Sequence, residues 1–453
     1  MQTSGGITLY AKAYGDGKDT TKRTEVANVK TESLLEQVLS SENLNKAFLQ
    51  VKRNKGAEGI DGMKVNELSE HLKTNGEEMK EQIRNRKYKP NPVRRVEIPK
   101  PDGGIRNLGV PTVTDRFIQQ AIAQVLTPIY EKQFHDNSYG FRPNRCAEMA
   151  IIKCLDMMND GYSWIVDIDL EKFFDTVNHD KLMNIISRTI TDGDVISIIR
   201  KFLVSGVMIE DEYKETIIGT PQGGNLSPLL SNIMLNELDK ELEARSLNFV
   251  RYADDAMIFT KSEKSATRVM ASVTKLLEEK LGLKVNVTKS KVDRPKGIKY
   301  LGFGFYYDAF SHQFKAKPHL TSVKKLKEKV KQITSRSWGV STSYRLMKLK
   351  QLIVGWVNYF KIGQMKRVCK EIDEHLRFRL RMCIWKQWKK VKTRYKNLQK
   401  LGIPRGKAWE WANTRKGYAR VARSFILCRA ITNERLKKFG LISLLDQYQL
   451  IHI

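Results

Sequence analysis

Apolar and polar positions divide the chain into a long first part, where helical and extended patterns alternate, and a last part with helical patterns only. Residues 31–52 carry leucines and valines at the spacing of an amphipathic helix. From about residue 318 onward the extended pattern is absent, and we predict basic helices with a break near Gly402-Ile403-Pro404. Further helices are predicted over 114–133, 144–160, 180–204, 226–245 and 264–281.

Short runs of strand length lie between these helices. Residues 93–108 predict a hairpin whose turn is Pro101-Asp102-Gly103-Gly104. Other strands are predicted over 164–170, over 249–252 with 256–260, and over 299–306. Strands that come from distant parts of the sequence and mix with long helices favour an α+β domain with an antiparallel sheet.

Two carboxylates stand at the tip of one predicted hairpin. Asp254 and Asp255 follow Tyr252-Ala253 and precede the apolar run 256–259. Aspartate is common in turns because its side chain hydrogen-bonds to the nearby backbone. On its own, this pair is therefore more typical of a structural turn than of a site.

A second acidic strand changes that interpretation. Within 164–170, strand alternation places Asp167 and Asp169 on one face and apolar residues on the other. Two strands that present carboxylates toward a common point can bind a pair of Mg²⁺ ions, which prefer hard oxygen ligands. Two such ions, about 3.5–4 Å apart, can activate a 3′-hydroxyl and stabilise a leaving pyrophosphate. The sequence thus indicates a phosphoryl-transfer site.

Positive charge is concentrated in the last third of the chain. The 80 Lys and Arg residues against 50 Asp and Glu residues give a formal net charge of +30. Residues 1–310 contribute +2 of this charge and residues 311–453 contribute +28. A segregated basic region indicates a module that binds a polyanion. Anionic lipid would also attract it, but the aromatic residues interleaved with the basic ones favour nucleic acid.

The cysteines and the apolar runs indicate the cellular location of the protein and whether it contacts a membrane. None of the five cysteines forms a C-x-x-C pair, so we expect reduced thiols, no zinc and a cytoplasmic location. There is no apolar run of about 18 residues, and we expect no membrane partner. Residues 1–30 lack hydrophobic periodicity and predict a disordered tail.

The motifs around the carboxylates resemble those of group II intron-encoded reverse transcriptases, also called maturases, and they occur in that family's order. Each motif alone is weak, whereas the ordered set is specific and covers nearly all of the chain from about residue 31. The motifs are RRVEIPKPDGGIR at 94–106, NSYGFRPNR at 137–145, DLEKFFD at 169–175, GTPQGGNL at 219–226, YADD at 252–255, Asn-x-x-Lys at 286–289, YLGF at 300–303 and GWVNYF at 355–360.

The resemblance implies a right-hand polymerase of the α+β class. It places the fingers and palm, with an antiparallel sheet, over 31–310 and an α-helical thumb or maturase (X) domain over 311–400. A small basic DNA-binding (D) domain is expected over 401–453. The HNH endonuclease domain is expected to be missing, as in bacterial members that lack it, because there are no cysteine pairs and the sequence ends at Ile453.

The resemblance also implies a catalytic triad. Asp169, Asp254 and Asp255 would bind two Mg²⁺ ions, with Mn²⁺ as a substitute, and the backbone carbonyl of Leu170 would be a further metal ligand. In the family the first acid lies five residues before an aromatic that checks the sugar. Asp169 has this spacing from Phe174.

Two residues beside these positions have alternative interpretations. Asp167 lacks the family's spacing, so we expect it to be a supporting or exposed acid. Phe174 would leave no room for the 2′-hydroxyl of a ribonucleotide, although an ordinary core residue next to Phe173 also fits the sequence.

Four further residues are expected to contact the dNTP substrate. Lys100 and Arg106 flank the predicted turn and would neutralise charge on the triphosphate. Gln222 resembles the family's glutamine that contacts the base pair. Lys289 would lie near the pyrophosphate, and Lys291 is an alternative for that role.

The leading hypothesis is an RNA-directed DNA polymerase that extends a DNA primer on an RNA template. It would bind its parent group II intron RNA, assist splicing, and contact target DNA during retrohoming. One alternative is an RNA-folding maturase in which polymerisation is incidental or lost, which the intact YADD motif argues against. Another is a group II-like polymerase recruited to defence or repair, although the GWVNYF motif favours an intron partner.

Overall fold

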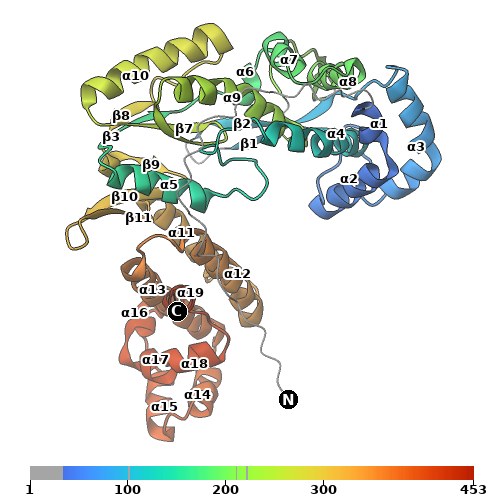
Figure 1. The fold of residues 1–453 in the computed structure, drawn as a ribbon. Coiled ribbons are helices and arrows are strands. Elements are labelled where there is room, and N and C mark those ends of the chain that lie inside the picture. The colour runs from blue at the N-terminus through green and yellow to red at the C-terminus, as the bar shows by residue number, and fades with distance from the viewer. Residues whose placement is uncertain (1–33, 100–102, 211, 221–222, 453) are drawn as a thin grey trace, which may run out of the picture.

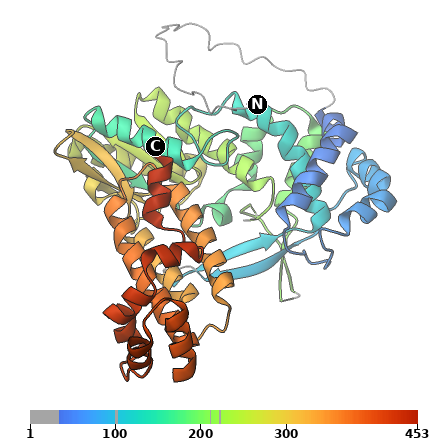
Figure 2. The same ribbon diagram turned by 90° about the horizontal axis from the view of Figure 1, so that it is seen from below.

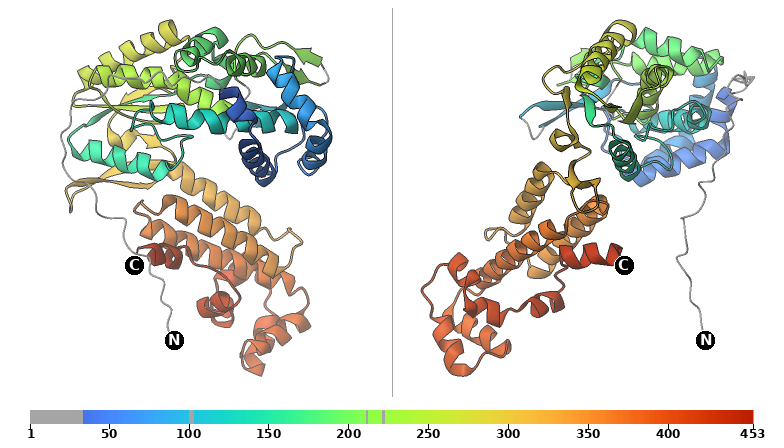
Figure 3. Two further views of the ribbon diagram at one scale, coloured as in Figure 1. Left: turned by 45° about the vertical axis from the view of Figure 1, so that its right-hand side comes forward. Right: turned by 60° about the vertical axis from the view of Figure 1, so that its left-hand side comes forward.

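The computed structural model describes residues 34–99, 103–210, 212–220 and 223–452 (Figure 1). It consists of an α+β body and a helical arm, which we define as residues 320–451. The arm lies below the body in Figure 1, and the first helices of the chain lie at the right-hand end of the body; Figures 2 and 3 show the same parts from other sides. The predicted α+β class with a helical C-terminal region is confirmed. The predicted tail over 1–30 lies outside the described residues, as do Lys100 and Gln222.

Four helices from the first part of the chain pack together and form one end of the body. The single helix predicted over 31–52 is two helices, α1 (Leu34–Leu39) and α2 (Ser41–Asn54). They separate at Ser40, whose hydroxyl accepts a hydrogen bond from the amide of Asn43 and caps α2. The apolar faces of α1, α2 and α3 (Leu68–Arg84) pack in one core with α4 (Val113–Glu131).

The predicted hairpin over 93–108 is present and belongs to a larger sheet. Strands β1 (Val93–Pro99) and β2 (Ile105–Val110) pair antiparallel. Strand β4 (Val207–Ile209) then adds parallel to β1, and β5 (Glu212–Lys214) completes the order β2-β1-β4-β5. A segment more than 100 residues along the chain therefore supports the hairpin from one side.

The palm sheet combines strands from three separate regions. They are β3 (Trp164–Ile168), β6 (Asn248–Tyr252), β7 (Asp255–Thr260) and β8 (Lys291–Asp293), in the antiparallel order β6-β7-β3-β8. Ile168 at the end of β3 pairs with Ala256 near the start of β7. This register brings Asp169 beside the β6–β7 turn.

Helices cover one face of the palm sheet, and helix α5 (Ala147–Asn159) with a second sheet covers the other. Val166, Phe249 and Ile258 pack with residues of α9 (Ser227–Ala244) and α10 (Glu263–Lys275). Helices α6 (Phe173–Thr176), α7 (His179–Ser187) and α8 (Gly193–Leu203) complete this layer, and α10 continues as a π-helix over Leu276–Leu281. The helix predicted over 180–204 is thus two helices.

The second sheet connects the palm to the helical arm. It contains β9 (Lys299–Tyr300), β10 (Phe303–Asp308) and β11 (Gln313–Pro318) in the order β11-β10-β9. The predicted boundary at residue 310 falls inside the β10–β11 turn, so the hairpin straddles it. The domain boundaries remain predictions.

The helical arm begins with three long helices and continues with short ones. Buried aromatic residues such as Trp385 and Trp411 belong to its core. No helix among the described residues has both the length and the apolar character needed to cross a membrane. In chain order the helices are α11 (Leu320–Ile333), α12 (Thr342–Phe360), α13 (Lys366–Gln387), α14 (Val391–Lys400), α15 (Arg405–Ala412), α16 (Tyr418–Arg423), α17 (Phe425–Ala430), α18 (Asn433–Lys438) and α19 (Leu444–Ile451).

Candidate active site

A pocket of about 550 Å³ lies where the palm sheet meets the β1–β2 hairpin. It gathers residues that are far apart in the sequence, with acids on the palm side and a cation from β2. The predicted site residues that line it are Arg106, Asp169, Leu170, Phe174, Asp254, Asp255 and Lys289. Asn107, Lys172 and Asn286, for which the sequence predicted no role of their own, line it as well. The pocket therefore places candidate metal ligands and candidate dNTP contacts in one space.

The sheet register and one turn place Asp169 in this pocket. Asp169 directly follows β3, and its carbonyl accepts a hydrogen bond from the amide of Asn286 over 2.8 Å. Its amide donates to the hydroxyl of Ser290 over 3.0 Å. Leu170 continues the pairing through a bridge to Val285. The Asn-x-x-Lys element thus holds the main chain at the end of β3.

Desolvation and neighbouring carboxylates raise the pKa of both aspartates of the β6–β7 turn. Partial loss of hydration, followed by the charges of Asp254, Asp169 and Asp167, raises the pKa of Asp255 to about 7. The pKa of Asp254 is raised mainly by desolvation and also by Asp169, while Arg106 opposes the shift. The site therefore concentrates negative charge, which a bound cation would neutralise.

The donor chemistry of the triad suits a divalent cation. Carboxylate oxygens are the hard ligands that Mg²⁺ prefers. Across the ranges that the structure describes, no three acidic, histidine or cysteine side chains are already grouped as a metal site.

Asp167 and Lys291 lie beside the pocket and do not line it. Desolvation, partly opposed by Lys291, raises the pKa of Asp167 to about 6. Lys291 pairs with Asp167 across β3 and β8, and its ammonium donates to Asp293 and to the carbonyl of Gly297. Of the two lysines considered for the pyrophosphate, Lys289 is the one that faces the pocket.

Phe174 forms a wall between this pocket and a neighbouring cavity of about 260 Å³. Its ring contacts the edge of the Phe173 ring, with 5.3 Å between the ring centroids. Its carbonyl accepts a hydrogen bond from the amide of Thr220 over 2.6 Å, and Gly219 donates to Val177 over 2.8 Å. The GTPQGGNL segment is thereby tied to the main chain of the candidate sugar gate.

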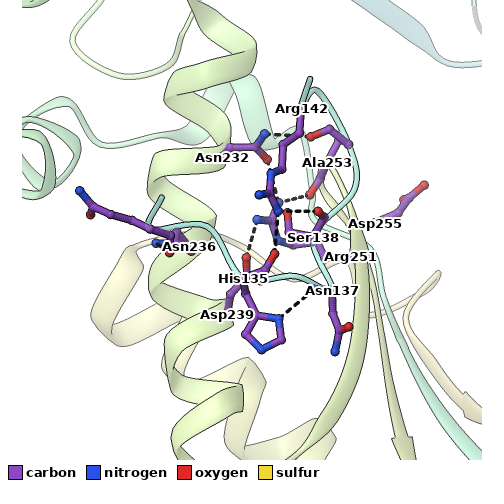
Figure 4. Close-up of polar contacts among 12 residues, drawn as sticks. His135, Asn137, Ser138, Arg142, Asn232, Asn236, Asp239, Arg251, Ala253 and Asp255 are labelled. Carbon is purple, nitrogen blue, oxygen red and sulfur yellow. Dashed lines mark hydrogen bonds and ion pairs between the residues drawn. The ribbon is translucent and has the colours of Figure 1, made fainter. Parts of the chain in front are cut away.

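A buried cluster behind the carboxylates was not predicted from the sequence. Arg251 is fully buried, forms an ion pair with the equally buried Asp239, and donates to the carbonyl of Ala253 (Figure 4). The signal that the sequence contains is an arginine among the apolar and aromatic residues of the run 249–252, directly before the acidic turn.

Comparisons with known proteins identify two successive regions. Residues 98–305 match the family described as "Reverse transcriptase (RNA-dependent DNA polymerase)". Residues 323–402 match the "Group II intron, maturase-specific domain". The first match contains the described pocket residues, and the second falls in the helical arm.

Curated relatives extend this similarity. "Protein YkfC" of Escherichia coli (strain K12) is 31% identical over 316 residues, which cover 61% of this chain and 83% of that protein. "Putative COX1/OXI3 intron 2 protein" of Saccharomyces cerevisiae is 27% identical over 78% of this chain and 47% of its own length. "Group II intron-encoded protein LtrA" of Lactococcus lactis subsp. cremoris is 42% identical over 36% of this chain and 27% of its own length. The chain thus spans less than half of these two intron proteins.

The palm sheet, its acidic pocket and the match over 98–305 define a protein with an RNA-dependent DNA polymerase domain. With the maturase-specific match that follows and the extent of the YkfC similarity, the chain belongs to the group II intron reverse transcriptase and maturase family. A solved structure of telomerase from Candida albicans aligns with 73% of this chain and 65% of its own, at 13% identity and a TM-score of 0.43, a likeness too low to add to this assignment.

Proposed function

We propose that the chain copies an RNA template from a DNA primer by two-metal nucleotidyl transfer in the pocket of Asp169, Asp254 and Asp255. The observation that carries the proposal is this pocket itself. It joins carboxylates from two strands to Arg106 of the fingers hairpin and to the ring of Phe174. Phosphoryl transfer requires mainly such positioning and charge neutralisation.

The family resemblance assigns roles to several of the residues that line the pocket, and their chemistry is compatible with these roles. Bound Mg²⁺, for which Mn²⁺ is a substitute, would activate the primer 3′-hydroxyl and stabilise the leaving pyrophosphate. The three aspartates would hold the two ions, with the carbonyl of Leu170 as a further ligand. The cation of Arg106 would neutralise the dNTP triphosphate. Lys100 and Gln222, outside the described residues, are proposed to join it at the triphosphate and the base pair.

Phe174 and Lys289 complete the proposed dNTP site. The half-buried ring of Phe174 forms a wall of the pocket, where it would exclude a 2′-hydroxyl. Lys289 lines the same pocket and would place its charge near the pyrophosphate. Phe174 would thus select the sugar, and Lys289 would neutralise negative charge.

The helical arm supplies the nucleic-acid surface in this proposal. The lysines of α11 are exposed, whereas Leu326 and Val330 of the same helix are buried. Such a surface binds phosphates through charge. We propose that residues 311–400 hold the RNA–DNA duplex and the parent group II intron RNA, and that residues 401–453 contact target DNA. The maturase-specific match supports splicing assistance. Retrohoming and a cytoplasmic location belong to the same proposal.

Primer extension tests the proposal. Purified protein is expected to extend a DNA primer on an RNA template with dNTPs and Mg²⁺. Asp254→Ala should abolish extension and retain RNA binding, whereas Asp180→Ala, at an exposed acid of α7, should retain both. Robust synthesis by Asp254→Ala would remove the metal assignment. Tight binding of intron RNA without extension by the wild type would instead support the RNA-folding maturase.

A further inference from the structure

We propose that Arg251 is a positioning residue that holds the turn carrying Asp254 and Asp255 through the carbonyl of Ala253. Its expected consequence for polymerisation rests on the proposed function above. The statement that a buried guanidinium holds the turn rests only on the observed contacts and not on the proposed function. Figure 4 shows the cluster, in which the side chain of Asp255 points away from Arg251.

The turn has a conformation that its own residues do not favour. Tyr252 pairs with Asp255 across β6 and β7, so Ala253 and Asp254 form a two-residue loop. Loops of this length need a positive φ at the first central residue, where glycine is preferred. Here Ala253 has a φ of 57°, which a residue with a Cβ adopts only with strain. Contacts from outside the turn must therefore stabilise it.

Arg251 provides such a contact from a fixed position. One of its terminal nitrogens, Nη1, donates to the carbonyl of Ala253 over 2.9 Å. Nε and Nη2 donate to the two oxygens of Asp239 over 2.8 and 2.6 Å. Because the guanidinium is planar, this two-point ion pair determines where Nη1 lies. The Ala253 carbonyl is thereby located relative to helix α9, which carries Asp239.

Asn232, two turns before Asp239 on α9, connects Arg251 to the segment that contains Gly140. Its side-chain oxygen accepts a hydrogen bond from Arg251 Nη1 over 3.0 Å, and its nitrogen donates to the carbonyl of Gly140 over 2.8 Å. A Cβ at Gly140 would lie 2.1 Å from the amide nitrogen of Ala253. Residue 140 must therefore be glycine for its segment to press against the turn.

The segment containing Gly140 also pairs with the main chain of Arg251. The amide of Arg251 donates to the carbonyl of Asn137 over 2.9 Å, and the amide of Tyr139 donates to the carbonyl of Arg251 over 2.8 Å. The sequence assigned no chemical role to the NSYGFRPNR motif. In the structure it packs against the acidic turn and pairs with the strand that precedes it. The side chain and the main chain of Arg251 are both held at the point where the turn begins.

A stabilising ion pair alone is the alternative explanation. Buried ion pairs often contribute little more to stability than an apolar pair of similar volume, and such a role requires no contact with the turn. The two explanations predict different effects of substitution. A stabilising pair affects unfolding alone, whereas a positioning residue also affects the local mobility of the turn and the chemical step.

Arg251→Lys separates these explanations because it keeps the charge and loses the two-point geometry. We expect faster hydrogen exchange in the segment 248–260 and a kcat for single-nucleotide addition lowered by about 10²-fold, the effect of a misplacement of about 1 Å. Primer–template affinity should be unchanged. Asn232→Ala, which leaves the Arg251–Asp239 pair intact, should show the same effects more weakly and keeps the test available if Arg251→Lys does not fold.

Leu242→Ala is the matched control, since Leu242 is a fully buried residue of α9 outside the cluster. It should lower the melting temperature without changing kcat or exchange in the turn. If Arg251→Lys and Asn232→Ala behave like Leu242→Ala, the cluster is only stabilising and the proposal is wrong. If the wild type shows no polymerisation, the proposed function fails, while the hydrogen-exchange comparison still decides whether Arg251 holds the turn.

Discussion

The hydroxyl of Ser290 holds the main chain of Asp169 at two points. It accepts a hydrogen bond from the Asp169 amide over 3.0 Å and donates to the Asp169 carbonyl over 3.3 Å. These contacts join positions 121 residues apart in the chain. Ser290 immediately follows the Asn-x-x-Lys element, so this segment contributes to the pocket through the backbone as well as through Lys289.

Ser290→Ala should therefore weaken both stability and catalysis. The loss of a partly buried hydrogen-bond partner lowers the free energy of unfolding by about 1 kcal/mol. We also expect slower single-nucleotide addition with unchanged primer–template affinity, because the main chain of Asp169 loses both hydrogen bonds to Ser290 and its carboxylate is held less firmly in the pocket. Chemical denaturation and single-turnover extension measure the two effects. Ser187→Ala, at an exposed serine of α7, is the control. A loss of stability with a normal rate would limit Ser290 to a structural role.

His179 should make the protein less stable on mild acidification, whereas the raised pKa of Asp255 acts in the opposite direction, because the folded protein then binds a proton more readily than the unfolded chain. Burial lowers the pKa of His179 below its ordinary value of 6.5, although its Nε2 contacts the carbonyl of Gly219 over 2.6 Å. Below about pH 6.5 the unfolded chain binds a proton that the folded protein binds less readily, so the stability present above this pH is lost as the pH falls. Melting temperatures of the wild type and of His179→Gln, both measured from about pH 8 to about pH 5.5, separate the contribution of His179 from that of Asp255.

As the pH falls, the melting temperature of the wild type should decrease relative to that of His179→Gln, whereas His452→Gln, at an exposed residue, should follow the wild type. A constant difference between the wild type and His179→Gln across this range would contradict the assignment to His179. Because Gly219 precedes the predicted base-pair contact Gln222, the same acidification is expected to slow primer extension before the protein unfolds.

Phe174→Ala should admit ribonucleotides if the ring excludes the 2′-hydroxyl. A steric difference of one small group changes discrimination by roughly 10–200-fold, so we expect a rise of that order in the ratio of ribonucleotide to deoxyribonucleotide incorporation. Competing extension reactions measure this ratio. Phe173→Leu is the matched control, because Phe173 is a buried neighbour that contacts Phe174 edge to face. It should reduce stability and preserve sugar discrimination. Unchanged discrimination in Phe174→Ala would remove this residue from the site.

Elements with strong local patterns could be predicted from the sequence, and those that depend on distant partners could not. Helix α9 (Ser227–Ala244) lies within one residue of the predicted range 226–245. The three residues of β4 (Val207–Ile209) form a strand because β1 offers them an edge, and no local periodicity marks them. The helix predicted over 180–204 divides because Asp192 accepts hydrogen bonds from the amides of Asp194 and Val195 and so caps a new helix.

The candidate site shows the same limit. Its carboxylates lie in short local motifs, so a resemblance could name Asp169, Asp254 and Asp255, and the structure places all three at one pocket. Their roles remain predictions. Arg251 was missed because a charged residue in a strand ordinarily predicts a solvent-exposed position. Its partner Asp239 lies on a separate helix, and only the folded chain brings the two together.

Salt dependence provides a test of the helical arm. Lys324, Lys327 and Lys331 of α11 are exposed and recur at the spacing of one helical face. Each phosphate contact contributes about 0.7–0.9 to the slope of log affinity against log salt concentration. Replacing the three lysines by glutamine should therefore weaken RNA binding most at low salt and reduce the slope by about 2–3 if all three contact phosphates. Titrations at several KCl concentrations measure both quantities.

The matched control replaces the same number of exposed lysines on the palm helices, namely Lys240 of α9 with Lys264 and Lys275 of α10. Both triple variants lose the same net charge, so a nonspecific attraction between the whole protein and RNA would decrease equally in the two. If the α11 lysines contact phosphates, the slope of log affinity against log salt concentration should be smaller in the α11 variant alone. Equal slopes in the two variants would contradict the assignment of α11 to nucleic-acid binding, and the charge of the arm would then act only as a long-range attraction.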